Sequence, residues 1–252
     1  MQAGDFALVP VFLPASFRLA LPGFQAGLTP ADRQTRNCIH RNYIIELIEM
    51  NNIIILASPY SCIQPECLRE LHDLVAGIQV PGAVVECGVA NGGAAAVIWS
   101  AAGTERELWL FDSFEGLPRP TLPDGGRAFS KYDYHIATHG SWCKGSSKHV
   151  EYIVSQVGDL DKVKIVPGWI ENTLPEYAAQ IGQIAVLHID VDFYEPTRCA
   201  LEWLHHLVVD GGLVVVDDYS YWPGCKTAVD EYLSGRGIVP VAMLGAPVYW
   251  NK

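Results

Sequence analysis

The chain has 252 residues, half of them hydrophobic, and a formal net charge of −11. This length allows one large domain with a full core, or one domain with a helical extension. The acidic balance and the lack of Lys and Arg clusters argue against nucleic acid as a partner, because gripping a phosphate backbone requires such clusters. The longest apolar runs fall far short of the roughly 20 residues that a membrane-spanning helix needs, so we expect no membrane span.

The N-terminal residues are mildly apolar, but prolines interrupt them and no basic segment precedes them. This pattern disfavours a signal peptide. Seven cysteines, an odd number without a CxxC pair, favour reduced thiols over a disulfide framework. We therefore expect a cytoplasmic protein.

The first 80 residues lack the alternation of strands and helices that follows them. Periodic apolar positions predict amphipathic helices in 41–50 and 65–78, so we interpret residues 1–80 as an N-terminal helical extension or lid. Residues 81–252 form the second part of the predicted organisation.

Apolar strands followed by glycine turns and helices recur through residues 81–252. The expected strands are 83–88, 107–112, 163–168, 185–190 and 212–218, and the clearest helical stretches between them are 94–103, 146–158 and 197–210. Continuous apolar strands joined by helical crossovers predict an α/β fold, a mostly parallel Rossmann-like sheet with helices on both faces. The stretch 117–148, rich in Gly, Pro, Ser and Lys, is expected to be a mobile loop over the site.

A glycine-rich turn follows the first expected strand. The strand ends at Glu86, and Gly88, Gly92 and Gly93 follow in "VVECGVANGG", where glycines let the backbone turn tightly and approach a ligand. Asp112 ends the second expected strand, a position from which an acid can accept both hydroxyls of a ribose. The two features together predict a nucleoside site.

The glycine spacing bears on which nucleoside binds. A dinucleotide fingerprint needs glycine two places after the first, and Ala90 stands there, so NAD fits poorly. S-adenosylmethionine (SAM) has no phosphate to cradle, and its amino group would favour a nearby acid such as Glu86. Trp169 in "VPGWIENTLP" could stack on the adenine or could belong to the core.

Carboxylates end two later strands. Asp190 follows the fourth expected strand in "LHIDVDFYEP", and Asp217 and Asp218 follow the fifth in "GLVVVDDYSYW". Neighbouring strands lie about 4.8 Å apart, so these acids can converge on one ion. Ligands that are all oxygen favour Mg²⁺. The alternative is that Asp217 caps a turn and Asp218 is solvated.

These motifs, in this order, resemble one family. The segments "VVECGVANGG", "LWLFDSFEGLP", "VKIVPGWIENTLP", "VLHIDVDFYEPT", "LVVDGGLVVVDDY" and "CKTAVDEY" are similar to the TylF/MycF macrocin O-methyltransferases, which methylate sugar or related hydroxyls of natural products. The resemblance covers roughly residues 60–252. It implies a Rossmann-like methyltransferase core, SAM and Mg²⁺ as cofactors, and a homo-oligomer, a dimer or tetramer.

The resemblance also implies roles for individual residues. It places the metal on three acids and the cofactor on the glycine turn and the next strand ends: Asp190, Asp217 and Asp218 for the metal; Glu86, Gly88, Gly92, Gly93, Asp112, Ser113 and Trp169 for SAM. Family members often have Trp and a basic residue where this chain has Ala90 and Asn91, and segment 121–149 matches little. The acceptor therefore stays open.

Methyl transfer is an in-line displacement in which the acceptor oxygen must be aligned and deprotonated. A cation that holds two neighbouring hydroxyls would lower the pKa of the attacking one. Asp190 is the first candidate for the proton acceptor, and Asp192 is the second. His135 or His139, in the expected loop over the site, could replace either. His188 is expected to face the packed strand, whereas His205 and His206 are expected on a helix surface.

Three other functions remain compatible with these residues. A catechol-type methyltransferase would use the same acids with flat aromatic diols, and a carboxyl or amine methyltransferase could use the same scaffold. A non-catalytic nucleoside-binding protein would consume no cofactor. A nicotinamide dehydrogenase is disfavoured by the glycine turn and by the lack of a legible catalytic Tyr/Lys set.

Overall fold

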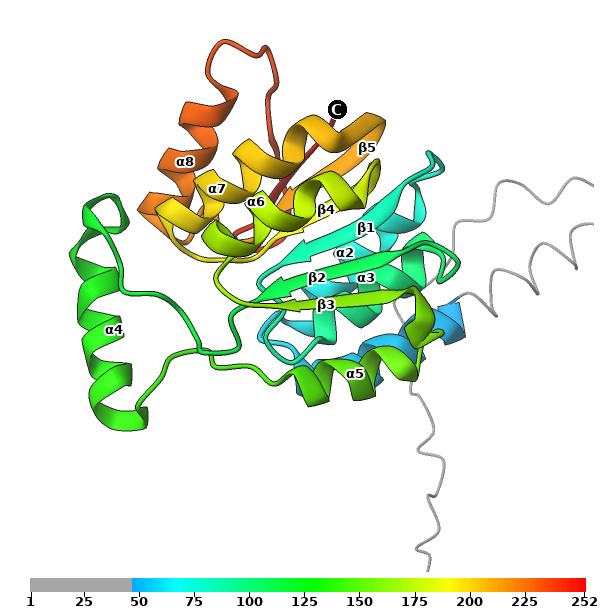
Figure 1. The fold of residues 1–252 in the computed structure, drawn as a ribbon, viewed down its shortest axis with the longest axis horizontal. Helices are drawn as coiled ribbons and strands as arrows, with labels where there is room; N and C mark the ends of the chain where they lie inside the picture. Colours follow the sequence, from blue (N-terminus) through cyan, green and yellow to red (C-terminus); the bar gives the residue numbers. More distant parts are fainter. Residues whose placement is uncertain (1–46) are drawn as a thin grey trace, which may run out of the picture. The chain divides into compact units, whose positions relative to one another are not determined.

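The computed structural model describes residues 47–252. Much of the expected helix 41–50 lies outside them, and residues 47–57 are helical. The described chain forms a sheet in the order β3-β2-β1-β4-β5-β7-β6 (Figure 1). The strands are β1 Ala83–Cys87, β2 Leu108–Asp112, β3 Val163–Pro167, β4 Ile184–Ile189, β5 Val208–Val216, β6 Val241–Ala242 and β7 Val248–Asn251.

The first five strands pair in parallel, whereas β7 runs antiparallel to both β5 and β6. All five residues of β1 and all six of β4 are buried. Strands covered on both faces read as unbroken apolar runs, which is why these segments could be recognised in the sequence. The expected α/β architecture with a mostly parallel sheet is confirmed.

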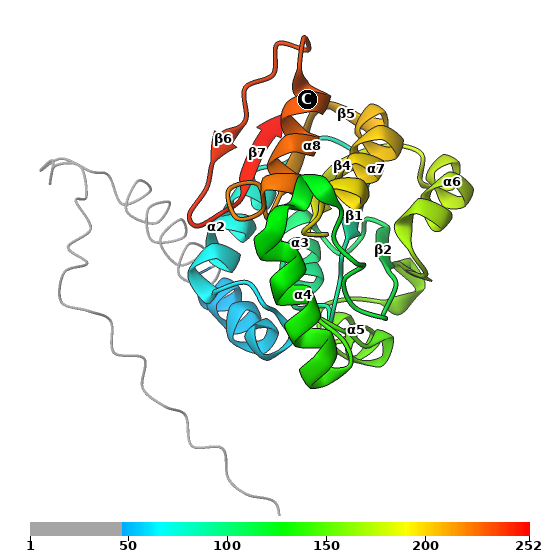
Figure 2. The same ribbon diagram turned by 90° about the vertical axis from the view of Figure 1, so that its left-hand side faces the viewer.

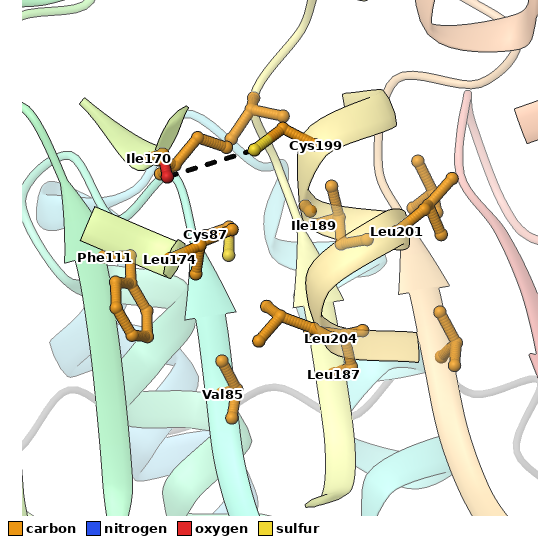
Figure 3. Close-up of a cluster of buried hydrophobic side chains, with 14 of the residues drawn as sticks. Val85, Cys87, Phe111, Ile170, Leu174, Leu187, Ile189, Cys199, Leu201 and Leu204 are labelled. Atoms are coloured by element: carbon orange, nitrogen blue, oxygen red, sulfur yellow. Dashed lines mark hydrogen bonds between the residues drawn. The ribbon is translucent and has the colours of Figure 1, made fainter. Parts of the chain in front are cut away.

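Helices cover both faces of the sheet. One core lies under α6 (Ile170–Ile181), α7 (Tyr194–Leu204) and α8 (Pro223–Leu233). The second lies under the helix of residues 47–57 together with α2 (Pro65–Ala76), α3 (Gly93–Ala102) and α5 (Ser147–Ser155). Figure 3 shows the first core, where Cys87 of β1 lies beside Leu174 of α6, and Leu187 of β4 lies beside Leu204 of α7.

Segment 117–148 is not the irregular loop that its composition suggested. It contains the short 3₁₀ helix η2 (Leu122–Asp124) and the helix α4 (Gly125–His139). Only Ala128 of α4 is buried, so its sequence carries a weak apolar stripe and is easily taken for a loop. Figures 1 and 2 show α4 in front of the carboxyl ends of the strands.

The expectation that His205 lies on a helix surface was wrong. His205 begins the 3₁₀ helix η4 (His205–Leu207) and is only 6% exposed. Its Nε2 accepts a hydrogen bond from the indole of Trp250 at 3.1 Å, and burial lowers the pKa of His205 to about 4. The neighbouring His206 is exposed, as expected.

The strand register brings the functional strand ends to one edge. Ile189 of β4 pairs with both Cys87 of β1 and Val216 of β5. The backbone N–H of Asp190 donates to Cys87, and that of Asp217 donates to Ile189. The residues that follow these strands therefore lie side by side at the carboxyl edge, where open α/β sheets bind their ligands. None of the helices within residues 47–252 combines the length and apolar character that crossing a bilayer requires.

Candidate functional site

A pocket of about 600 Å³ opens at the carboxyl edge of the sheet. One wall comes from the glycine turn after β1, the end of β2 and the start of α6. The base carries the acids that follow β4 and β5. The remaining wall comes from segments 62–67 and 245–247, from segment 117–148 (the lid) and from the residues just before α8. A volume of this size suits a small-molecule cofactor with part of an acceptor.

Gly88 stands at the closest backbone approach in the site. Its φ is +86°, and a Cβ at this position would overlap the carbonyl oxygen of Asp190. Only glycine meets both conditions, because other residues pay for a positive φ and carry the Cβ. The turn after β1 therefore lies directly against the residue that follows β4, and Gly88 lines the pocket as the sequence interpretation anticipated.

The other two glycines of the turn face the interior. A Cβ at Gly92 would lie 2.9 Å from Ile153 of α5, and one at Gly93 would lie 2.6 Å from Ser61. Neither glycine lines the pocket. Their small size allows α3 to begin against its neighbours, so the structure gives them a packing reason and leaves their role toward the cofactor a prediction.

Glu86 also points away from the pocket. It is 1% exposed, and its Oε1 lies 2.9 Å from Nδ1 of His188 on β4. Burial raises the pKa of the Glu86 carboxyl, and the contact with His188 opposes that rise. The expected packed, hydrogen-bonded environment of His188 is confirmed. The assignment of Glu86 to the amino group of SAM rests on the resemblance alone.

Asp112 holds the glycine turn in place. Its Oδ2 accepts the backbone N–H groups of Val89 at 2.7 Å and Ala90 at 2.8 Å, and its Oδ1 accepts that of Phe114 at 2.6 Å. Each carboxylate oxygen has two acceptor positions, so Oδ1 retains one. Asp112 lines the pocket and can both shape the turn and accept a ligand hydroxyl.

Ser113 and Trp169 complete this wall. The hydroxyl of Ser113 accepts the N–H of Glu115 at 3.0 Å and donates to the carbonyl of Gly116 at 3.3 Å. Trp169 immediately precedes α6, is partly exposed and lines the pocket. A partly exposed indole at a pocket wall offers a flat apolar surface for a ring.

Four acids lie on the base of the pocket: Asp190, Asp192, Asp217 and Asp218. Ligand oxygens of Asp190, Asp192 and Asp218 lie within 4.8 Å of one another. Asp217, which the sequence interpretation placed in the metal set, is outside this group, and Asp192 completes it. The expected convergence of acids from two strand ends is thus present with a different third member.

Within the described residues, these carboxyl groups lack a cationic partner. Among residues 47–252, none of the four acids forms an ion pair with Lys or Arg. Instead, the carboxyl groups of Asp190, Asp192 and Asp218 lie against one another. Buried carboxyl groups this close to one another repel unless they are protonated or bind a cation.

Desolvation dominates the electrostatics of this group. Burial, with added repulsion from the neighbouring acids, raises the pKa of Asp190 and of Asp218. Burial also raises the pKa of Asp192 to about 7, although the indole N–H of Trp222 opposes this rise. Burial raises the pKa of Asp217, opposed by His188. Several carboxyl groups with raised pKa values in one pocket are typical of functional sites.

The two histidines of the lid, His135 and His139, do not line the pocket. His139 is exposed at the C-terminal end of α4. The ring of His135 instead stacks on Trp142, with centroids 4.9 Å apart and planes at 9°. The structure thus brings Asp190 and Asp192 together at the pocket base and leaves His139 apart from them.

Sequence reasoning missed the aromatic side of the site. Trp142, Tyr221 and Trp222 line the pocket, and the Nζ of Lys131 on α4 donates to the Tyr221 hydroxyl at 2.9 Å. The signal was available in "YSYWPG", where Trp222 precedes a proline that begins α8. The contacts with α4 join residues far apart in the sequence, so no local pattern announces them.

The fold and this pocket define a class I, Rossmann-like methyltransferase. The solved structure titled "Structure of the O-methyltransferase NovP" superposes with a TM-score of 0.65 at 32% identity, covering 77% of this chain and 82% of that one. The calicheamicin methyltransferase CalS11 has a TM-score of 0.58 at 21% identity, covering 90% of this chain and 94% of the other. The second comparison supports the fold alone.

The chain belongs to the macrocin O-methyltransferase (TylF) family, whose model matches residues 58–252. The demethyldecarbamoylnovobiocin O-methyltransferase of Streptomyces niveus is 36% identical over 196 residues, 74% of this chain and 72% of that protein. The mycinamicin III 3''-O-methyltransferase of Micromonospora griseorubida is 32% identical over 182 residues, 69% of each chain. The protein is therefore a SAM-dependent O-methyltransferase, as the motifs indicated.

Proposed function

We propose that this methyltransferase transfers the methyl group of SAM to a hydroxyl of a sugar or related natural product, with Mg²⁺ bound at the pocket base. The observation that carries the proposal is the convergence of Asp190, Asp192 and Asp218 within 4.8 Å at the pocket base, where no Lys or Arg of residues 47–252 forms an ion pair with them. Desolvated carboxylates repel one another unless they are protonated or bind a cation.

The chemistry of these donors fits a hard cation. Carboxylate oxygens are preferred ligands of Mg²⁺, which binds through a few carboxylates and keeps further positions for water or substrate. Asp217 borders the same pocket, so it could add charge to the site or serve as a ligand, as the family resemblance implies. Bound there, the cation would supply positive charge that favours ionisation of an acceptor hydroxyl.

The opposite wall fits SAM, the methyl donor. The free acceptor position on Oδ1 of Asp112 suits a ribose hydroxyl, and Trp169 offers a flat surface to an adenine ring. The glycine turn brings backbone rather than side chains to the ligand, since Gly88 has no room for a Cβ. The resemblance further implies that Glu86, Gly92, Gly93 and Ser113 bind SAM.

The side chains can then perform the two tasks of the reaction. The pocket excludes bulk water from one side of the acceptor and holds its hydroxyl beside the acids, in line with the cofactor wall. Asp190 or Asp192 accepts the hydroxyl proton as the oxygen attacks the methyl carbon of SAM, whose bond to sulfur breaks so that S-adenosylhomocysteine leaves. His139 remains a candidate proton acceptor only if the lid moves, because it lies outside the pocket lining.

The acceptor class comes from the relatives. One is named for methylation of demethyldecarbamoylnovobiocin and another for the 3'' hydroxyl of mycinamicin III. Trp142, Tyr221 and Trp222 give this pocket an apolar wall beside the acids, which suits an acceptor with a polar sugar and an apolar body. We also infer that residues 1–80 form an N-terminal extension, of which 47–80 border the pocket through segment 62–67, and that the protein is a cytoplasmic homo-oligomer.

A methyl-transfer assay tests the proposal. The purified protein would be incubated with SAM and one of three acceptors, demethyldecarbamoylnovobiocin, mycinamicin III or catechol, in Mg²⁺ or in EDTA. Mass spectrometry would detect the methylated product, and chromatography would detect S-adenosylhomocysteine. We expect product from a glycoside in Mg²⁺ and almost none in EDTA.

Two variants make the result specific. Asp190→Asn should abolish transfer while leaving cofactor binding, whereas Asp210→Asn, at an exposed position away from the pocket, should transfer at the wild-type rate. Transfer that is equally fast in EDTA would contradict the cation. Transfer to catechol alone would assign the protein to the catechol type.

A further inference from the structure

Asp192 has a backbone conformation that few non-glycine residues adopt. Its φ is +61°, and it lies between the end of β4 and the start of α7. Asp tolerates the left-handed region better than most residues do, but the conformation is still unfavourable and persists only where neighbouring contacts hold it. The direction of the Asp192 carboxylate is therefore set by its tertiary surroundings.

One contact fixes that carboxylate. The indole N–H of Trp222 donates to Oδ1 of Asp192 at 2.8 Å. Trp222 is 1% exposed, and the proline that follows it begins α8. Because Trp222 is buried and immediately precedes α8, its ring is held in one orientation, and its single N–H points toward Asp192.

Three aromatic rings pack against the indole of Trp222. The ring of Tyr221, the preceding residue, packs edge-on with centroids 4.9 Å apart. Phe193, the residue after Asp192, packs edge-on against Trp222 with centroids 5.6 Å apart. Trp142 packs edge-on against Trp222 at 5.9 Å and against Phe193 at 6.0 Å. The rings of Trp142, Phe193 and Trp222 form a closed triangle, so Trp222 can turn only if a neighbouring ring moves as well.

Trp142 connects this triangle to the lid and to the cofactor wall. Its ring stacks on His135 of α4. Its carbonyl oxygen accepts the N–H of Leu117 at 2.8 Å, and a Cβ on Gly116 would overlap that oxygen. The segment that follows Ser113 is thereby fastened to the same residue that packs on Trp222.

We propose that Trp222 is a positioning residue, whose indole N–H holds the Asp192 carboxylate beside Asp190 and Asp218, and that Trp142 braces it so that this arrangement depends on the lid. The inference rests on the proposed function, since it concerns the acids assigned to the cation. Groups that orient metal ligands commonly change metal affinity by 10–100-fold when removed.

The substitution Trp222→Phe tests the hydrogen bond with little loss of packing. Phe keeps an aromatic ring in the triangle and lacks the N–H donor. The matched control is Trp250→Phe, which removes the indole N–H of another buried tryptophan, one that donates to His205 and does not line the pocket. Titration calorimetry would measure the affinity of each protein for Mn²⁺ with S-adenosylhomocysteine present.

We expect Trp222→Phe to bind Mn²⁺ at least about tenfold more weakly than the wild type. Its affinity for S-adenosylhomocysteine and its far-UV circular dichroism should be unchanged, and Trp250→Phe should bind Mn²⁺ like the wild type. Equal Mn²⁺ affinity in Trp222→Phe and the wild type would overturn the inference and leave the proposed cation site intact. A wild-type protein that binds no Mn²⁺ would contradict the cation site itself, and the inference with it.

A double-variant cycle separates positioning from general damage. Asp192→Gly removes the carboxylate with a residue that accepts the positive φ. If Trp222 acts through Asp192, adding Trp222→Phe to Asp192→Gly should not weaken Mn²⁺ binding further. A further loss as large as in the wild-type background would show that Trp222 acts by another route, contrary to the inference.

The dependence on the lid has its own test. Trp142→Ala removes the ring that braces Trp222 but leaves the hydrogen-bond donor in place. We expect it to weaken Mn²⁺ binding severalfold, whereas Trp142→Phe should restore most of the affinity. Wild-type Mn²⁺ affinity in Trp142→Ala would contradict the claim that the arrangement of the acids depends on the lid through Trp142.

Discussion

The crowding of acids at the pocket base predicts that Asp192→Asn stabilises the cation-free protein. Asn has the shape of a protonated Asp and tolerates a positive φ, and its amide oxygen can still accept the hydrogen bond from Trp222. The substitution therefore removes the charge of Asp192 while keeping its packing.

The magnitude follows from the pKa of Asp192. Burial raises this pKa to about 7 in the folded protein, whereas an unfolded Asp ionises near 3.9. The two pKa values differ by about three, and a difference of one in pKa corresponds to roughly 1.4 kcal/mol of stability, so the upper bound is ~4 kcal/mol. Because the carboxylate is partly exposed and lies beside other acids that titrate with it, we take about half, ~2 kcal/mol.

The sign is fixed by proton binding. Between the unfolded and folded pKa values the folded state keeps a proton that the unfolded state has lost, so stability falls as pH rises from about 4 to about 7. Asn does not titrate and escapes this loss. Asp192→Asn should therefore match the wild type at about pH 4 and exceed it by ~2 kcal/mol at about pH 8.

Urea unfolding followed by circular dichroism, in EDTA at constant ionic strength, gives the two free energies of unfolding. The exposed Asp210→Asn is the control and should change the free energy by less than about 0.5 kcal/mol at either pH. A variant that is less stable than the wild type at both pH values would refute the reasoning, because it would show that the Asp192 charge is not strained by its neighbours.

Three further predictions concern other parts of the chain. The pKa of His205 is about 4 in the folded protein and near 6.5 in the unfolded protein, so the wild type loses up to ~3 kcal/mol of stability as pH falls between these values. His205→Gln should remove this loss, which urea unfolding would detect, with the exposed His206→Gln as the control. An acid response in His205→Gln identical to that of the wild type would contradict this. Gly88→Ala should destabilise the protein by roughly 3 kcal/mol or more, because of the positive φ at this position and the overlap of a Cβ with Asp190. Gly126→Ala, in the open part of α4, should be neutral or slightly stabilising. Equal melting temperatures for Gly88→Ala and the wild type would refute the close approach. Trp169→Ala should weaken S-adenosylhomocysteine binding about tenfold by calorimetry, and Trp203→Ala, at an exposed position on α7, should not; unchanged affinity in Trp169→Ala would remove it from the cofactor wall.

The parallel sheet was predictable because β1, β2, β4 and β5 are strongly apolar and each is followed by a polar or glycine turn. Such strands leave little choice of architecture. The short strands β6 and β7 lack this signal, and β7 is placed by its antiparallel pairing with β5. Helix α4 buries a single residue, so its periodicity was too weak to separate it from a loop.

The acids of the site were predictable as a set but not in their arrangement. Strand ends at one edge bring Asp190 and Asp218 together, which the order of the strands implies. The third position depends on the left-handed turn at Asp192 and on the hydrogen bond from Trp222. That bond joins residues 30 apart in the sequence, and no local pattern carries it.

The glycines show the same limit. Gly88, Gly92 and Gly93 belong to one motif, yet only Gly88 lines the pocket. Gly92 and Gly93 are small because α5 and the segment around Ser61 press against them. A glycine-rich turn identifies a tight connection, whereas the partner of each glycine is decided by helices that arrive from elsewhere in the chain.

The most direct test of the central claim is calorimetric titration of the purified protein with S-adenosylhomocysteine, followed by Mg²⁺, in the wild type and in Asp190→Asn. The account predicts that both proteins bind the nucleoside with similar affinity and that only the wild type shows a separate Mg²⁺ event. A wild type that fails to bind Mg²⁺, or an Asp190→Asn variant that binds it equally well, would contradict a cation held by the acids of β4 and β5.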